Sequence, residues 1–379
     1  MMKALLMVSG SVHNADMYYA TRFLSLDPFI YIRDTSGRAI IIVSPMEYER
    51  AKKESILSEI RSTADYDGGG GDANERREEL IILKALREEG IDEVEVPKYF
   101  PLYIADSLRK AGITVTPVEE LELTKEREVK AKWEIEYIKK AQRACEDAMR
   151  VAIEEIRNAR IDGEHLVAND GEGEILTSER VRASIEHALV DSGCSCDGGE
   201  PIVACGKKAS DPHFSGYGTI FAHEPIIIDI FPRLKSGRYF ADMTRTVVRG
   251  EPSSGLKEMY EAVKFAQESA EESVREGVRC SDVHNLVCDI FEEMGYETTR
   301  TNAHANRGFI HSTGHGVGLD VHESPYIGDN DYVLREGNVI TIEPGLYEPE
   351  VGGVRLEDMV LVRKSGCENL TRFEKRLVI

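Results

Sequence analysis

The chain has 379 residues, of which 41% are hydrophobic and 30% charged, and its formal net charge is −21. This length and composition predict one large or two smaller folded domains with a sizeable core. So negative a surface argues against nucleic acid and anionic membranes as partners. No segment approaches the roughly 20 apolar residues of a membrane span.

The seven cysteines indicate the kind of cellular compartment in which the protein works. Their number is odd and their spacing fits no disulfide framework, which favours a reducing, intracellular setting. The opening residues MMKALLMVSG contain too short an apolar run for a secretion signal, and no small-residue cleavage site follows. We therefore expect a cytoplasmic protein.

The first 123 residues predict a small α/β domain, because strand and helix patterns alternate along them. Strands are predicted at FIYI (29–32) and AIIIV (39–43), with a hairpin-like connection between them, and further strand ends at VEVP and ITVTP. Helices are predicted over 46–60 and 74–90. The run DGGGGD that precedes the second helix lacks the strand and the Lys-Ser/Thr pair of a phosphate-binding loop.

A domain boundary is predicted near 123–127, where the pattern changes to one long charged helix. We expect this helix to run from Thr124 to about Arg157, and its apolar side to contain Trp133, Ile135, Ile138 and Ala141. The acidic stretch at 169–174 is interpreted as a solvated loop, followed by a helix capped at Thr177–Ser178.

The second domain, 127–379, contains an internal echo of two helices followed by two strands. The copies are helices over 130–157 and 177–192 with strands within 226–248, and helices over 255–276 and 281–294 with strands within 339–362. Asp229 and Asp242 lie 13 residues apart in the first strand pair, and Glu343 and Glu357 lie 14 apart in the second. The repeat predicts a pseudo-symmetric domain with its site between the halves.

Those four acidic residues are the first candidates for chemistry. Asp229 ends the apolar run IIID, where an ionised carboxylate is costly unless it is paired or metal-bound. A single acid of this kind is more often a strand cap or a salt-bridge partner. Four of them at repeated positions instead favour a site that binds cations.

The segment HSTGHGVGLDVHESP (311–325) supplies the histidines that such a site needs. His315 stands between glycines, which let the backbone approach a crowded centre closely. An imidazole beside carboxylates is typical of manganese, cobalt, iron or zinc hydrolases rather than calcium sites. One histidine and four acids can hold two ions. His213, in SDPHFSGYG shortly before the first acidic strand, is a candidate for a supporting role.

Taken together, these motifs closely resemble the pita-bread metallopeptidases, in the branch of Xaa-Pro aminopeptidases and Xaa-Pro dipeptidases (prolidases). The motifs that carry the resemblance are ADMYYATRFLSLDPFIYI, EVKAKWEIEYIKKA, DIFPRLKSGRYFADMTRT, GHGVGLDVHE, TIEPG and GVRLED. The resemblance implies an α+β protein with a creatinase/prolidase-like α/β domain over 1–123 and a pita-bread catalytic domain of two pseudo-two-fold halves over 127–379. It also implies a homodimer.

The resemblance further implies that two divalent ions are bound, manganese or cobalt before zinc or iron. Asp229 would chelate one ion, Asp242 and Glu357 would bridge both, and His315 and Glu343 would complete the second.

Other residues receive supporting roles from the same resemblance. His213 and His322 would contact the substrate or stabilise the tetrahedral intermediate, and Arg355 would steady the carboxylates, with Thr244 behind them. Glu343 or Glu357 is the candidate to carry the proton to the leaving nitrogen.

Two departures from the family pattern bear on these expectations. The first acid spacing is 13 where the family commonly shows 11, so LKSGR is expected to lengthen a hairpin turn away from the metals. After His322 and Glu323, many prolidases carry an arginine that can grip a dipeptide's carboxylate, and here Tyr326 takes its place.

The sequence therefore favours an Xaa-Pro aminopeptidase that removes the first residue from proline-containing peptides, with a strict Xaa-Pro dipeptidase as the alternative. A methionine aminopeptidase would not need the N-terminal domain. A creatinase-like enzyme or a non-catalytic binding protein of the same fold would be expected to lose metal ligands, and all five are present.

Overall fold

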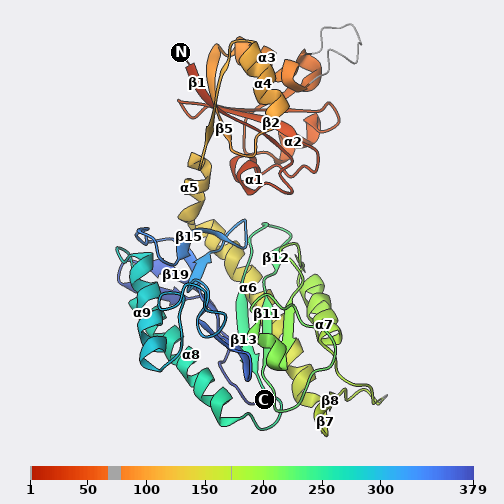
Figure 1. Cartoon of the computed structure of the whole chain (residues 1–379). Coiled ribbons are helices and arrows are strands. Elements are labelled where there is room, and N and C mark those ends of the chain that lie inside the picture. The colour runs from red at the N-terminus through yellow and green to blue at the C-terminus, as the bar shows by residue number, and fades with distance from the viewer. Residues whose placement is uncertain (1, 67–77, 172) are drawn as a thin grey trace. The chain divides into compact units, whose positions relative to one another are not determined.

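The structure is a computed structural model that describes residues 2–66, 78–171 and 173–379. It divides into two compact units, Met1–Arg127 and Glu128–Ile379 (Figure 1). The glycine-rich run DGGGGD and the first residues of the helix expected from 74 lie outside the described residues. All seven cysteines are free thiols.

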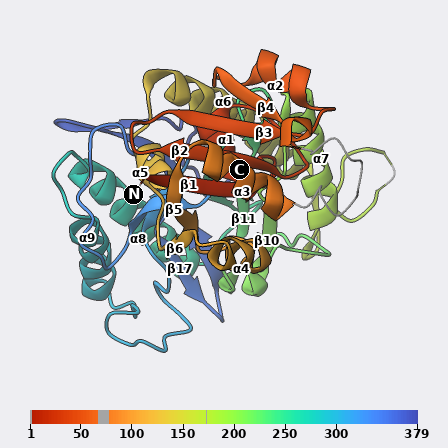
Figure 2. The ribbon, with the colours of Figure 1, turned by 90° about the horizontal axis from the view of Figure 1, so that it is seen from above.

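The first unit is built on one six-stranded sheet in the order β4-β3-β2-β1-β5-β6 (Figure 2). Side chains alternate between two apolar layers, so that Leu6 and Ile30 pack on one face and Met7 and Tyr31 on the other. The strands are β1 Met2–Ser9, β2 Phe29–Asp34, β3 Ala39–Val43, β4 Glu59–Ser62, β5 Ile91–Pro97 and β6 Thr114–Val118. The helices are α1 Ala15–Thr21, α2 Tyr48–Glu54, α3 Glu78–Glu88, α4 Leu102–Lys110 and α5 Glu122–Glu128.

The hairpin expected between 29–32 and 39–43 is confirmed, since β2 and β3 pair antiparallel. The helix expected over 46–60 is too long, because α2 ends at Glu54 and Ile60 lies in β4. There Ile60 pairs with Ile41 of β3, so that sheet pairing outweighs the helical pattern of the sequence.

The second unit contains two helix pairs, in which α6 packs against α7 and α8 against α9. The strands lie between these pairs, with α8 and α9 on one side and α7 on the other (Figure 1). The helices are α6 Lys132–Asn158, α7 Ser178–Asp191, α8 Ser254–Ser273 and α9 Cys280–Glu293. The predicted cap of α7 is confirmed, because the Thr177 side chain accepts from Arg180 N–H.

The strands of the second unit form two main sheets, β10-β11-β13 and β15-β14-β16-β19-β20. Their members are β10 Ile202–Cys205, β11 Ile226–Ile230, β13 Met243–Val247, β14 Gly314–Gly316, β15 Glu323–Ile327, β16 Val339–Ile342, β19 Asp358–Arg363 and β20 Gly366–Asn369. Short two-stranded ladders add β7 Arg160–Asp162, β8 His165–Val167, β9 Cys194–Ser195, β12 Arg233–Leu234, β17 Gly345–Glu348 and β18 Gly352–Arg355. The antiparallel pairs β11–β13 and β16–β19 are the counterparts that the internal echo predicts.

The single long helix expected from Thr124 to Arg157 is wrong, because α5 ends at Glu128 and α6 begins at Lys132. The Glu134 carboxylate accepts from Ala131 N–H and thereby caps the new helix. Lys130 N–H donates instead to the carbonyl of Gly337. Trp133 is also misplaced by the prediction, since it is 46% exposed while the other expected apolar residues of this helix are buried.

The two strands expected within 339–362 are in fact four. Pro344 follows β16 and cannot donate to a ladder, and the chain turns there into the β17–β18 hairpin before β19 begins. This hairpin places Arg355 and Glu357 next to the end of β16. In the part of the chain that the structure describes, no helix is long and apolar enough to cross a membrane.

Candidate metal centre

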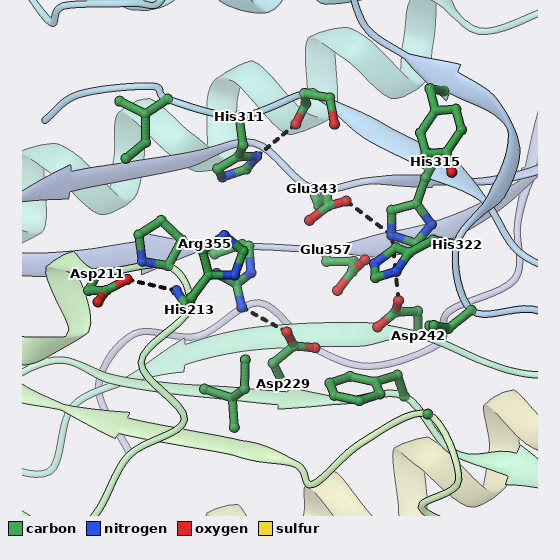
Figure 3. A pocket seen from close by; sticks show the side chains of 18 of the residues that line it. Asp211, His213, Asp229, Asp242, His311, His315, His322, Glu343, Arg355 and Glu357 are labelled. Atoms are coloured by element: carbon green, nitrogen blue, oxygen red, sulfur yellow. Dashed lines mark hydrogen bonds and ion pairs between the residues drawn. The ribbon is translucent and has the colours of Figure 1, made fainter. Parts of the chain in front are cut away.

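The four acidic residues singled out in the sequence converge with His315 on one cavity (Figure 3). Asp229 lies on β11 and Asp242 directly before β13, and the antiparallel pairing of these strands brings the two carboxylates together. Glu343 directly follows β16 and Glu357 directly precedes β19, which pair in the same way. The two halves therefore each supply two acids.

His315, Asp242 and Glu357 form the tightest group of possible metal ligands. One ligand atom from each lies within 4.8 Å of the others, and all three side chains are buried. His315 Nε2 lies 3.7 Å from Asp242 Oδ2 and 3.2 Å from Glu343 Oε1. Side-chain donors at these separations suit ions bridged by shared carboxylates.

The backbone around His315 fixes the direction of its ring. Nδ1 lies 3.1 Å from the carbonyl of Gly316, and donation of its proton there leaves the lone pair of Nε2 facing the acids. A Cβ at Gly314 would overlap the Thr341 carbonyl oxygen, so β14 can approach β16 this closely only with glycine at that position.

The charges of this cluster are unfavourable without a cation. Burial and the charges of Glu357 and Asp229 raise the pKa of Asp242 well above its ordinary value. Burial and the charges of Glu343 and Asp229 do the same to the pKa of Glu357. Burial and mutual repulsion thus disfavour the ionised form of both carboxylates.

Glu343 behaves differently because it faces His315. Burial alone would raise its pKa, but the hydrogen bond and the charge of His315 outweigh burial and lower the pKa to about 2. Burial would lower the pKa of His315, and the bond to Glu343 instead raises it. Each of the two groups therefore stabilises the charged form of the other.

Asp229 provides an independent test of whether cations fit. Its Oδ2 accepts from Arg355 Nη2 at 2.7 Å, whereas its buried Oδ1 has no hydrogen-bond partner among the described residues. A buried carboxylate oxygen without a partner is costly unless a cation binds it. The donor set of four carboxylates and one imidazole thus fits divalent ions of the manganese, cobalt, iron and zinc type.

Arg355 and Thr244 lie in a layer behind the acids and contact them. Arg355 Nε donates to Thr244 Oγ1 at 3.2 Å, and the Thr244 hydroxyl donates to Glu357 Oε2 at 2.8 Å. Together with the bond to Asp229, this chain holds one carboxylate from each half of the domain in place.

His311 and Tyr347 extend this layer, and the sequence analysis assigned neither a role. Arg355 Nη1 donates to the Tyr347 hydroxyl oxygen at 2.9 Å. His311 lies 2.9 Å from the same hydroxyl, and its Nδ1 lies 2.7 Å from the carbonyl of Ser312. Burial lowers the pKa of His311, so the neutral ring donates from Nδ1 and accepts the tyrosine proton at Nε2. The sequence signal that could have pointed to His311 is its position four residues before His315.

The two remaining predicted residues line the cavity, whose volume is about 910 Å³. The ring of His322 stacks edge-on against His315, with centroids 4.3 Å apart. His213 is exposed on the loop after β10, where its backbone N–H donates to Asp211 Oδ1 at 3.0 Å. Tyr326 also lines the cavity and is half exposed.

Comparison with known proteins places these features in a family. The model of metallopeptidase family M24 matches residues 136–364. An Xaa-Pro dipeptidase of Pyrococcus horikoshii is 32% identical over 351 residues, which cover 92% of this chain and 88% of that protein. An Xaa-Pro dipeptidase of Pyrococcus furiosus is also 32% identical, over 350 residues that cover 92% of this chain and 88% of that protein.

Solved structures agree. The prolidase from Pyrococcus horikoshii OT3 matches with a TM-score of 0.79 at 30% identity, over 99% of this chain and 95% of that one. The X-Pro aminopeptidase from Thermotoga maritima matches with a TM-score of 0.80 at 26% identity, over 100% and 98%. The expected α+β pita-bread fold is confirmed by these neighbours, and the chain belongs to metallopeptidase family M24 as a metallo-exopeptidase.

Proposed function

We propose that the protein is an Xaa-Pro dipeptidase that uses two divalent metal ions. The relatives that align over nine-tenths of the chain at 32% identity are Xaa-Pro dipeptidases, and this supports the dipeptidase over the aminopeptidase that the sequence motifs favoured. The observation that carries the metal-dependent part is the convergence of four acids and His315 on one cavity, where Asp229 Oδ1 has no hydrogen-bond partner among the described residues.

In this proposal the ions are held by Asp229, Asp242, His315, Glu343 and Glu357. When bound, two such ions would supply a hydroxide at neutral pH and polarise the scissile carbonyl. Manganese or cobalt are the proposed metals.

The remaining residues act on the substrate and the proton. Glu343 or Glu357, which both line the cavity, is the proposed group that takes a proton from the attacking water and returns it to the leaving nitrogen. Burial and the charge of His315 lower the pKa of His322, so its neutral ring can donate a hydrogen bond to an oxygen that becomes negative. His213 stands across the cavity as the second such donor (Figure 3).

The apolar part of the cavity wall suits a proline ring. Its apolar lining includes Ile202, Phe231, Ile310 and Val321. A pyrrolidine ring gains from leaving water for such a surface. The Xaa-Pro bond also lacks an N–H, so a site that selects it needs no acceptor for that proton.

One observation favours an Xaa-Pro aminopeptidase as the second candidate. Among the described residues that line the cavity, Arg355 alone carries a permanent positive charge, and it is paired with Asp229. The carboxylate of a dipeptide would therefore find no unpaired arginine or lysine in this wall. A longer peptide places an uncharged amide at that point.

The test is a panel of substrates with the protein loaded with Mn²⁺ or Co²⁺. Xaa-Pro dipeptides, Xaa-Pro-Yaa tripeptides and Met-Ala peptides are compared by kcat/KM. Turnover confined to dipeptides supports the proposal, and turnover of the longer Xaa-Pro peptides supports the aminopeptidase. If no Xaa-Pro peptide is cleaved, both are wrong.

A variant pair tests the bridging role of Asp242. Asp242→Ala should abolish turnover and reduce the number of bound ions, since it removes a carboxylate shared between both sites. Asp331→Ala is the matched control, because Asp331 is 97% exposed and lies outside the cavity lining. Activity that survives in Asp242→Ala contradicts the assignment.

We also propose that the protein works as a homodimer in the cytoplasm. The seven free thiols support a reducing compartment. The net charge of −21 supports small peptides, rather than nucleic acid or membranes, as its partners. Sedimentation at several protein concentrations tests the dimer.

A further inference from the structure

Arg245 is a buried cation that the proposed chemistry does not use. It lies on β13 three residues after Asp242, is 1% exposed, and is among the largest fully buried side chains of the described residues. Arg245 is not among the residues that line the cavity, whereas the neighbouring acids Asp229 and Glu357 are. A buried arginine is costly unless every donor is satisfied.

The contacts of Arg245 meet that condition in full. A guanidinium has five N–H donors. Nη1 donates to the carbonyls of Thr244 at 2.9 Å and Glu357 at 2.7 Å. Nη2 donates to Asp358 Oδ1 at 2.7 Å and to the carbonyl of Phe373 at 2.8 Å, and Nε donates to the carbonyl of Glu374 at 3.1 Å.

These partners belong to segments that no sheet joins. Thr244 lies on β13, at the edge of the three-stranded sheet, and Asp358 begins β19, in the five-stranded sheet. Glu357 N–H donates to the Thr244 carbonyl at 3.1 Å, directly beside the guanidinium. Arg245 therefore spans the seam between the two halves of the domain at the level of Glu357.

The last residues of the chain close the same seam. Lys375 Nζ pairs with Asp358 Oδ2 at 2.8 Å. Val248 N–H donates to the carbonyl of Leu377 at 2.6 Å, and Ile379 N–H donates to the carbonyl of Val248 at 3.1 Å. The segment 373–379 thus lies along the strand that carries Arg245, although none of it lines the cavity.

From this geometry we propose that Arg245 is a positioning residue for the metal centre. It fixes the separation of the two half-sheets, with the tail 373–379 as its third anchor, and thereby sets the distance between the acids of one half and those of the other. Two bound ions would tolerate little change in that distance, because the residues proposed to hold each ion come from both halves. The inference rests on the proposed role of Glu357 as a metal ligand.

The test uses Arg245→Lys, which keeps the charge but has three donors in place of five, and Arg245→Met, which removes them all. Arg249→Met is the matched control, since Arg249 follows the same strand and makes one bond of 3.3 Å, to the carbonyl of Ala159. Metal-free proteins are titrated with Co²⁺, and ion number, dissociation constant and visible absorption spectrum are recorded.

We expect Arg245→Lys to fold, to weaken Co²⁺ binding about 10–100-fold and to change the Co²⁺ spectrum. Arg249→Met should match the wild type in all three. Wild-type affinity and spectrum in Arg245→Lys would overturn the inference while the proposed function stood. A wild-type protein that binds no Co²⁺ would instead overturn the proposed function.

Hydrogen exchange on the unaltered protein keeps the inference testable if the variants do not fold. Loading the metal-free protein with Mn²⁺ should slow amide exchange in the segment 373–379 as well as in β13, because the Arg245 side chain holds the segment, β13 and the start of β19 together. Protection of β13 without any protection of the tail would contradict the role given to the tail.

Discussion

Replacing Lys130 by Met should destabilise the second unit far more than the loss of an ordinary surface ion pair. Lys130 Nζ lies 2.7 Å from Glu323 Oε1, and the two side chains are 1% and 6% exposed. Glu323 directly follows His322, and Lys130 lies in the break between α5 and α6. The pair therefore ties that break to the segment that carries a proposed substrate-binding histidine.

The magnitude follows from the burial. At 2.7 Å and an effective dielectric constant of about 20, the attraction is about 6 kcal/mol before desolvation is subtracted. Removal of one partner from a buried pair usually costs about 3–5 kcal/mol, since the other charge stays buried. Asp320 N–H still donates to Glu323 Oε2 at 3.3 Å, so we expect the lower end, about 3 kcal/mol.

The assay is urea unfolding at pH 7, with a probe in the second unit. Lys207→Met is the matched control, because Lys207 and Glu350 are similarly close, at 2.8 Å, but are 60% and 89% exposed. That variant should unfold at the same urea concentration as the wild type, because solvent screens an exposed pair. Lys130→Met with Glu323→Gln should recover part of the loss, because the carboxylate no longer needs a partner. Equal losses in Lys130→Met and Lys207→Met would show that burial of the Lys130–Glu323 pair has no effect on its contribution to stability.

Three further outcomes are expected. Burial and the charge of Asp358 raise the pKa of Glu271 to about 7 from an ordinary 4.5, so the folded protein binds this proton more tightly than the unfolded chain. The stability that this group contributes is present below pH 4.5 and is lost as pH rises through 7, by about 3 kcal/mol. Urea unfolding at several pH values should therefore show a smaller dependence of the unfolding free energy on pH in Glu271→Gln than in the wild type. Removal of the metals by a chelator should lower the melting temperature. Re-addition of metal at 100 times the dissociation constant should restore about 2.7 kcal/mol of unfolding free energy per site. An unchanged melting temperature would argue against bound ions. Gly216→Ala places a Cβ onto the Val203 carbonyl at a φ of +88°, so it should displace the loop of His213. This displacement should lower kcat/KM and leave metal binding unchanged. Gly37→Ala is the control, because its Cβ meets no neighbour at the same φ, and it should change neither kcat/KM nor metal binding.

The sequence alone determined which residues would be chemically unusual. An acid that ends an apolar strand is conspicuous because burial makes its charge costly, and repetition at near-equal spacing showed that the acids belong to two similar halves. Short β-rich runs also located β2, β3, β5 and β6, and a Thr-Ser pair located the cap at Thr177, because these features depend on a few neighbouring residues.

Features that depend on distant partners were decided by the tertiary structure. At the break before α6, Lys130 N–H donates to the Gly337 carbonyl and the Lys130 side chain pairs with Glu323, and no local pattern records these distant partners. Ile60 became a strand residue because β3 offered it a partner. Tyr347 and Arg245 are chemically ordinary in the sequence.

The candidate metal centre shows the same division. Asp229, Asp242, His315, Glu343 and Glu357 could be named from the sequence, since each is locally anomalous. Three features required coordinates: the Asp229 oxygen that lacks a partner among the described residues, the hydrogen-bonded chain from His311 to Thr244, and the contacts of Arg245 between the two halves. Hydrogen-bond geometry is set by how separate segments pack and not by the order of residues within one segment.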